Sequence, residues 1–214
     1  MSESARTADF FDRYAKEFSD IYGNRNTLLN SIINGLFRRS MRLRYNMVIE
    51  GCDPVAGRTA LDIGSGPGHY SVELAKRGAS RVLGIDFADG MIDIAHNSAK
   101  RAGVEKTCEF ARGDFFKDEF SERFDYVFAM GFMDYVAEPE KTLRKAMELT
   151  KVRAFFSFPV AGGLLAWQRK LRYQSRCELY LYTEPQIREI FAKLPARIEI
   201  RRIDRDLFVT AHRT

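Results

Sequence analysis

Short apolar runs that alternate with amphipathic segments dominate the chain after Gly57. The apolar runs predict strands at residues 60–63, 81–86, 108–112, 126–130 and 154–158. Apolar residues at helical spacing between them predict helices over residues 69–77, 89–102 and 140–150. Strands and helices that alternate in this way are typical of βαβ units, so we expect a mostly parallel sheet covered by helices on both faces.

The two ends of the sequence carry different patterns. Helical spacing predicts a short aromatic helix over residues 7–21 and a longer one over 27–49, with Gly51, Pro54 and Gly57 ending the latter. The longer helix places most of its basic residues opposite its apolar side, namely Arg38, Arg39, Arg42 and Arg44.

The C-terminal part predicts a helix followed by a hairpin. Thr183 and Gln186 form a capping box for a helix that reaches Lys193. Residues 197–203 and 207–211 flank the polar turn Asp204-Arg205-Asp206, which predicts an antiparallel pair. The expected fold class is α/β: a Rossmann-like three-layer sandwich around a mostly parallel seven-stranded sheet with a C-terminal antiparallel hairpin.

Length and composition favour one domain. The chain has 214 residues, of which 45% are hydrophobic and 29% charged, values typical of a soluble globular protein. Within a single domain over 1–214 we expect a helical cap (1–56), a cofactor-binding core (57–160), a lid or substrate segment (161–182) and a C-terminal helix and hairpin (183–214). The N-terminus has no secretory pattern, so we expect a cytoplasmic protein.

The net charge and the cysteines exclude few kinds of ligand or site. The formal charge of +5 is compatible with anionic substrates, acidic surfaces or nucleic acid, and it does not choose among them. Cys52, Cys108 and Cys177 are far apart and lack partners at metal-ligand spacing. We therefore expect buried or incidental thiols, with neither a disulfide framework nor a metal site.

The most informative segment is the apolar strand that ends in Asp62 and Ile63 and turns through Gly64, Gly66 and Gly68 into a helix. Glycines are needed where the backbone turns sharply or a ligand approaches closely, and a helix N-terminus supplies unpaired N–H donors. Asp86 ends the next strand, where a carboxylate can accept hydrogen bonds from ribose hydroxyls. A nucleotide-type ligand is expected here.

These motifs resemble the class I S-adenosylmethionine-dependent methyltransferases, in which an acidic residue and one apolar residue precede Gly-x-Gly-x-Gly. The resemblance implies S-adenosyl-L-methionine as cofactor and S-adenosyl-L-homocysteine as product. Its glycine motif is carried by Asp62, Gly64, Gly66 and Gly68, and its ribose-binding position by Asp86. The same resemblance assigns the adenine to Phe87, Met91, Asp114 and Phe115, and the methionine part of the cofactor to the strand end at Met130.

A nicotinamide-dependent dehydrogenase is the main competing interpretation. Its Gly-x-Gly-x-x-Gly motif would require a third glycine at the position of His69. The charge of Asp62 would also oppose a pyrophosphate, whereas it suits a ligand that bears an ammonium and a sulfonium. The sequence therefore favours the methyltransferase.

Methyl transfer needs mainly alignment and exclusion of water, so the catalytic residues are less distinctive. Asp134 and Tyr135 follow the fourth core strand on the carboxyl edge of the sheet and are the candidates for direct roles. The strand end lacks the Asn/Asp-Pro-Pro-aromatic motif of enzymes that methylate exocyclic or amide nitrogens. Aromatic and basic residues in 161–182, among them Arg169, Arg172 and Arg176, suit an anionic or aromatic acceptor.

The N-terminal segment around Phe10 to Gly23 is similar to the start of small-molecule methyltransferases of the magnesium-protoporphyrin and ubiquinone-pathway types. This similarity implies that Tyr14 and Tyr22 close over the cofactor. The expected function is O- or N-methylation of a small molecule by direct in-line transfer. Three alternatives stay open: an RNA methyltransferase that uses the Arg38–Arg44 helix, a non-catalytic methyltransferase-like binding subunit, and a peripheral membrane contact through the same helix. Nucleic acid is the less expected partner, and the sequence does not indicate an oligomeric state.

Overall fold

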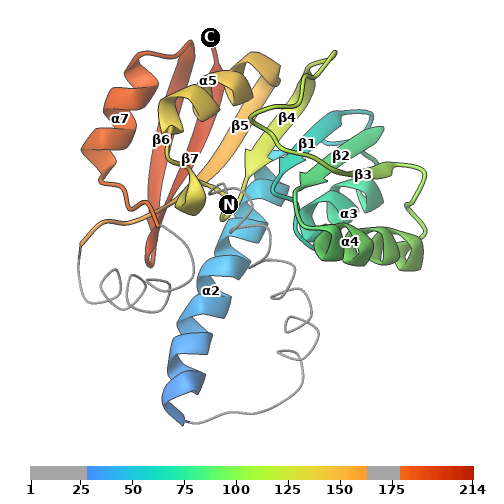
Figure 1. Ribbon diagram of the computed structural model, residues 1–214, viewed down its shortest axis with the longest axis horizontal. Helices are drawn as coiled ribbons and strands as arrows, with labels where there is room; N and C mark the ends of the chain where they lie inside the picture. The colour runs from blue at the N-terminus through green and yellow to red at the C-terminus, as the bar shows by residue number, and fades with distance from the viewer. Residues whose placement is uncertain (1–27, 163–178) are drawn as a thin grey trace.

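The computed structural model describes residues 28–162 and 179–214, and these form a seven-stranded sheet in the order β3-β2-β1-β4-β5-β7-β6 (Figure 1). The strands are β1 (Thr59–Ile63), β2 (Arg81–Asp86), β3 (Cys108–Arg112), β4 (Phe124–Ala129), β5 (Thr150–Pro159), β6 (Ala196–Ile203) and β7 (Asp206–Arg213). β1 to β5 pair in parallel, and β7 runs antiparallel to both β5 and β6. The expected fold class is confirmed.

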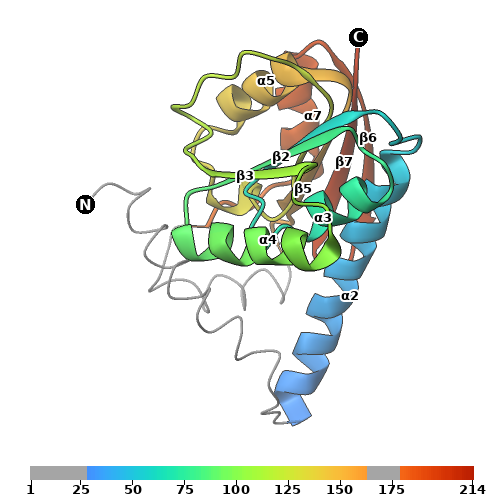
Figure 2. The same cartoon turned by 90° about the vertical axis from the view of Figure 1, so that its right-hand side faces the viewer.

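Helices cover both faces of the sheet, as Figure 2 shows. They are α2 (Leu28–Gly51), α3 (His69–Lys76), α4 (Asp89–Ala102), α5 (Pro139–Leu149) and α7 (Glu184–Ala192). One buried cluster joins the sheet to α5 and α7 through side chains such as Leu143 and Phe191. A second cluster joins the other face to α2, α3 and α4 through Val48, Leu74 and Ala95. The result is three layers, held together mainly by apolar burial.

The strand order reverses direction between β1 and β4, which are neighbours in the sheet. From β1 the chain proceeds to β2 and β3 on one side, and from β4 to β5 on the other. Loops that leave the carboxyl ends of β1 and β4 therefore separate, and open α/β sheets bind ligands at such a switch point. Both strands are almost fully buried, so they give this edge a rigid base.

Helix α2 extends well beyond the sheet at its N-terminal end, as both views show (Figures 1 and 2). Its C-terminal turns lie against the body of the molecule, where Val48 and Ile49 are buried. Ser40 Oγ donates a hydrogen bond of 3.1 Å to Asp204 in the β6–β7 turn. One helix is thereby fixed both to the core and to the hairpin.

Two predicted boundaries were wrong for identifiable reasons. The predicted helix 140–150 and strand 154–158 meet without a loop, because α5 ends at Leu149 and β5 begins at Thr150. Thr150 Oγ1 donates to Ala146 O at 2.7 Å, which closes the helix while the Thr150 backbone is already extended. In the hairpin, Asp206 pairs with Ile203 as the first residue of β7 instead of lying in the turn. Asp204 supplies the positive φ of 49° that the shorter turn requires.

The capping box predicted for the last helix is confirmed, because Thr183 and Gln186 exchange both capping hydrogen bonds. Cys52 and Cys108 are buried thiols, as expected, and burial raises the pKa of each to about 12. Cys177 and the predicted helix 7–21 lie outside the described residues.

Candidate functional site

The glycine loop between β1 and α3 has the backbone that its sequence predicts. Gly64, Gly66 and Gly68 have φ values of 69°, 51° and 75°, which side-chain-bearing residues rarely adopt. A Cβ at Gly68 would lie 2.7 Å from the Phe110 ring, so this position also requires the absence of a side chain. A Cβ at Gly66 would meet nothing within 4 Å, which leaves that residue beside open space. The loop is thus tightly folded at one end and accessible in its middle.

Asp86 fixes the glycine loop from the end of β2. Its Oδ2 accepts a hydrogen bond of 2.9 Å from Gly66 N, and its Oδ1 accepts one of 3.0 Å from Ala88 N. The carboxylate is half-buried, so a ligand can still reach it. A carboxylate held beside an open glycine can accept hydrogen bonds from vicinal hydroxyls of a sugar.

Asp62 is buried directly below the loop, with 1% of its surface exposed. Ser71 Oγ on α3 donates to Asp62 Oδ2 at 2.7 Å. Burial raises the pKa of Asp62 to about 7; hydrogen bonds from the Ser71 side chain and backbone oppose this rise, and the charge of Asp86 adds to it. A cation bound above the loop would favour the ionised form of Asp62.

The four residues assigned to the adenine lie on two neighbouring loops. Phe87 is half-buried after β2, and Met91 is buried in the first turn of α4. After β3, Asp114 Oδ1 accepts from Phe116 N at 3.1 Å and its Oδ2 pairs with Lys117 Nζ at 2.9 Å. Phe115 is only 3% exposed. The structure places these residues at one edge of the sheet, but the ring of Phe115 belongs to the main core.

The loop after β4 is anchored by Ser157, a residue that the sequence pattern did not single out. Gly131 N donates to Ser157 Oγ on β5 at 2.7 Å, and Arg44 Nη1 on α2 donates to the same oxygen at 3.3 Å. Arg44 Nη1 also lies 3.6 Å from Asp206 Oδ2. Arg44 was expected opposite the apolar side of its helix, but this ion pair holds it in the interior with 9% exposure. A serine inside the apolar run Ala154–Phe158 was the available signal.

The candidate catalytic residues form a short 3₁₀ turn, Met133–Tyr135, just after this loop. Asp134 is 4% exposed, and Tyr135 is half-buried. Tyr180 N donates to Asp134 O at 2.9 Å, and Tyr182 Oη donates to Val136 O at 3.1 Å. Burial and the nearby charge of Asp134 raise the pKa of Tyr182. The chain that returns after residue 178 therefore braces the turn that carries Asp134.

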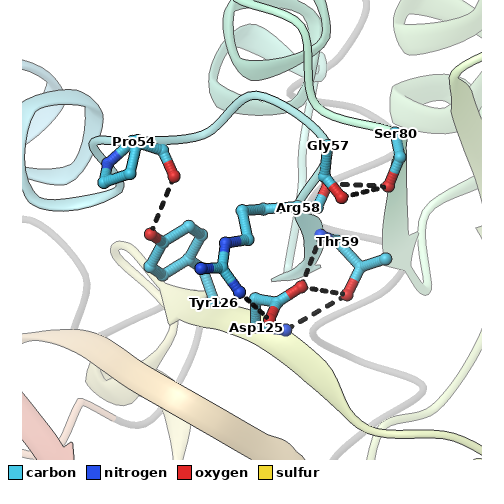
Figure 3. Close-up of polar contacts among 7 residues, drawn as sticks. All are labelled: Pro54, Gly57, Arg58, Thr59, Ser80, Asp125 and Tyr126. Atoms are coloured by element: carbon cyan, nitrogen blue, oxygen red, sulfur yellow. Dashed lines mark hydrogen bonds and ion pairs between the residues drawn. The ribbon is translucent and has the colours of Figure 1, made fainter.

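Several sequence candidates fall elsewhere. Tyr14, Tyr22 and the basic residues of the 163–178 segment lie outside the described residues. Asp125 lies near the start of β4, where its carboxylate accepts from Thr59 N at 2.9 Å and contacts Arg58 (Figure 3). Burial alone would raise the pKa of Asp125, but the hydrogen bonds from Thr59 and Arg58 bring it below its usual value. Asp125 therefore ties the start of β4 to the start of β1.

Met130 is half-buried at the end of β4, and His69 is exposed at the start of α3 without a side-chain cap on that helix. Across residues 28–162 and 179–214, no cluster of three or more His, Cys, Asp or Glu side chains could hold a metal ion. None of the helices in those two ranges is long and apolar enough to cross a membrane. What the described residues do provide is a glycine loop with two carboxylates at the sheet's switch point.

Comparison with known proteins agrees with this geometry. In sequence, the chain is 30% identical over 117 residues to a ubiquinone biosynthesis O-methyltransferase of Pseudomonas fluorescens, covering 54% of this chain and 50% of that protein. It is 28% identical over 155 residues to the Coxiella burnetii protein of the same name, covering 72% of this chain and 59% of that protein. The chain thus spans about half the length of the curated relatives it matches.

In structure, the chain is similar to magnesium protoporphyrin IX methyltransferase from Synechocystis PCC 6803 with bound S-adenosylhomocysteine. The TM-score is 0.78 at 18% identity, over 100% of both chains. This likeness supports the fold. The family model of the methyltransferase domain matches residues 54–161, just over half of the chain. The chain therefore belongs to the methyltransferase domain family.

Proposed function

We propose that the protein is an S-adenosylmethionine-dependent methyltransferase that acts on a small-molecule acceptor. The observation that carries the proposal is the arrangement of the glycine loop with Asp62 below it and Asp86 across it, inside the matched family domain. The names of the relatives add support, since they describe methyltransferases of ubiquinone biosynthesis and of a magnesium porphyrin.

The residues of the loop fit the proposed cofactor. Ser65 Oγ is buried and has no hydrogen-bond partner among the described residues, so a polar ligand group could satisfy it. Gly66 leaves the adjacent space free of any side chain. We infer that Asp86 binds the ribose hydroxyls, and that the uncapped N-terminus of α3 faces the carboxylate of the amino acid part.

When bound, S-adenosylmethionine supplies an electrophilic methyl group on a positively charged sulfur. The task of the chain is then to align an acceptor with that group and to exclude water. The 130–135 segment is suited to alignment, because Ser157 holds it at Gly131 and Tyr180 holds it at Asp134, while Arg44 donates to the same Ser157 oxygen. Held at both ends, the segment can present the same surface at each turnover.

We propose that the acceptor atom is oxygen or nitrogen, with Asp134 or Tyr135 beside it. An acceptor that is protonated at working pH needs a group to receive its proton. Asp134 is buried on the turn that follows β4, on the edge where the acceptor must lie. An acceptor that is already ionised would need only alignment, with Tyr135 donating a hydrogen bond to it.

The alternatives are less favoured. For an RNA methyltransferase, the basic face of α2 would have to contact phosphates, yet Arg44 is buried against Asp206. For a dehydrogenase, a pyrophosphate would have to approach a loop that has His69 where the dinucleotide motif requires its third glycine, with Asp62 beneath it. A non-catalytic binding subunit would retain the same cofactor loop, so only a turnover assay separates it from an enzyme.

The test is isothermal calorimetry of the purified protein with S-adenosylmethionine, S-adenosylhomocysteine and NADH. We expect one site for each of the first two compounds and no binding of NADH. Binding of NADH alone would overturn the proposal. A screen of metabolite extracts with labelled methyl donor, run beside total RNA and DNA, then identifies the acceptor class; label in RNA and none in small molecules would refute the small-molecule acceptor.

A further inference from the structure

The loop that follows β3 is held by a lysine from another element. Lys145, on α5, donates from Nζ to Phe115 O at 2.6 Å and to Asp118 O at 2.5 Å. The ammonium also lies 5.0 Å from the ring centroid of Phe115 and 5.4 Å from that of Phe120. A single cation therefore contacts two carbonyls and two aromatic rings of one loop, and each contact is of a favourable type.

The part of the loop between those carbonyls is one compact turn. Asp114 O accepts hydrogen bonds of 2.9 Å from both Lys117 N and Asp118 N. The Asp114 side chain accepts from Phe116 N at 3.1 Å. Because the turn is closed internally, fixing the carbonyls of Phe115 and Asp118 fixes the direction of the Asp114 carboxylate as well.

Helix α5 gives Lys145 a rigid base. Leu143, Ala146 and Met147 of α5 are fully buried against the sheet, while Lys145 is half-buried at the helix edge. Ordering a lysine side chain costs conformational entropy. The two charge-assisted hydrogen bonds and the ring contacts offset that cost. The loop they hold follows β3 and lies next to the end of β2 that carries Asp86.

We propose that Lys145 is a positioning residue for purine recognition. By holding the 114–118 turn, it keeps the Asp114 carboxylate and the adjacent backbone in the arrangement that binds the amino edge of the adenine. The inference rests on the proposed function, since the purine is that of the cofactor. Helix α5 carries no residue of the glycine loop and none that we assign to the ribose or the acceptor. Through Lys145 this helix gains a role in cofactor selectivity.

The test compares Lys145→Met with Lys145→Arg and with Lys141→Met, a matched control on the same helix whose lysine is exposed and pairs with Glu138. The probes are S-adenosylhomocysteine and S-inosylhomocysteine, which lacks the amino group. Without Lys145 the turn is free to move. If it then occupies the binding arrangement about a tenth of the time, Lys145→Met should bind S-adenosylhomocysteine about tenfold more weakly than the wild type. The affinity for S-inosylhomocysteine should change by less than about twofold, because this ligand has no amino group to contact the turn.

Lys145→Arg should retain most of the preference for adenine, and Lys141→Met all of it. A global loss of stability would weaken the binding of both ligands equally. The ratio of the two affinities therefore distinguishes a positioning role from a merely structural one. Unchanged affinities and an unchanged ratio in Lys145→Met would overturn the inference while the proposed function stands. If the wild type binds neither ligand, the proposed function itself fails.

A second measurement needs no ligand and applies even if one variant is too unstable for calorimetry. Amide hydrogen exchange at Lys117 and Asp118 reports whether their bonds to Asp114 O persist. We expect exchange at both amides to accelerate at least fivefold in Lys145→Met or Lys145→Gln, and to be unaffected in Lys141→Met. Equal protection in all variants would overturn the positioning role.

Discussion

Replacing Asp62 with asparagine should flatten the dependence of stability on pH. The Asp62 carboxyl is buried, with hydrogen bonds from Ser71, and burial raises its pKa to about 7. In the unfolded chain the same group titrates near 3.8. Between these values the native state retains a proton that the unfolded state has released, so raising the pH favours unfolding.

The magnitude follows from the two pKa values. The stabilisation is fully present below pH 4, falls as pH rises, and is lost above the folded pKa of about 7. Each unit of pKa difference corresponds to about 1.4 kcal/mol, so the complete loss is about 4 kcal/mol. Between pH 5 and pH 7.5 the Asp62 carboxyl alone should lower the free energy of unfolding by about 2–3 kcal/mol. Asparagine cannot titrate, so the variant lacks this contribution.

The assay is urea denaturation of the ligand-free protein at pH 5 and pH 7.5, for the wild type and Asp62→Asn. Other titrating groups are common to both proteins and cancel in the comparison. Asp125→Asn is the control, because the pKa of Asp125 lies below its usual value and this group does not titrate in the window. The reasoning is refuted if Asp62→Asn and the wild type lose equal stability over the pH interval.

Three further predictions concern the same site. Asp86→Ala should remain folded but bind S-adenosylhomocysteine about tenfold or more weakly by calorimetry, because charge-assisted hydrogen bonds contribute roughly 1.5–3 kcal/mol; an unchanged affinity would show that Asp86 is not the ribose ligand. Gly68→Ala should lower the unfolding free energy more than Gly103→Ala, by about 1 kcal/mol or more in urea denaturation, since φ is positive at both but only at Gly68 would Cβ meet a ring. Arg44→Met should cost about 3–5 kcal/mol by leaving the Asp206 carboxylate buried without this ion pair; equal stability of Arg44→Met and the wild type would contradict that.

The backbone of the proposed cofactor loop was predictable because its signals are local. The spacing of Asp62, Gly64, Gly66 and Gly68 dictates a strand, a tight turn and a helix start, and the structure has all three within ten residues. Asp86 followed from the same logic, as the last residue of the next strand. Positive φ and strand ends are properties of short segments, so one sequence is sufficient to locate them.

The supports of the site were not predictable from local pattern. Ser157 and Arg44 are 113 positions apart in sequence, and only the packing of α2 against β5 brings them together. The same packing draws Asp206 out of its polar turn into the sheet, since Arg44 lies beside it. Nothing in the segment around Lys145 indicates its hydrogen bond to the Phe115 carbonyl, 30 positions away. Such contacts depend on tertiary structure, which pattern analysis does not reach.

The contact between Ser40 and Asp204 has a consequence for synthesis of the protein. The two residues are 164 positions apart, and ribosomes add about 5–20 residues per second. Helix α2 therefore emerges about 8–30 seconds before the hairpin to which it binds. The bond that fixes the helix to the hairpin can therefore form only once nearly the whole chain has been made, after the core strands have already covered Val48 and Ile49.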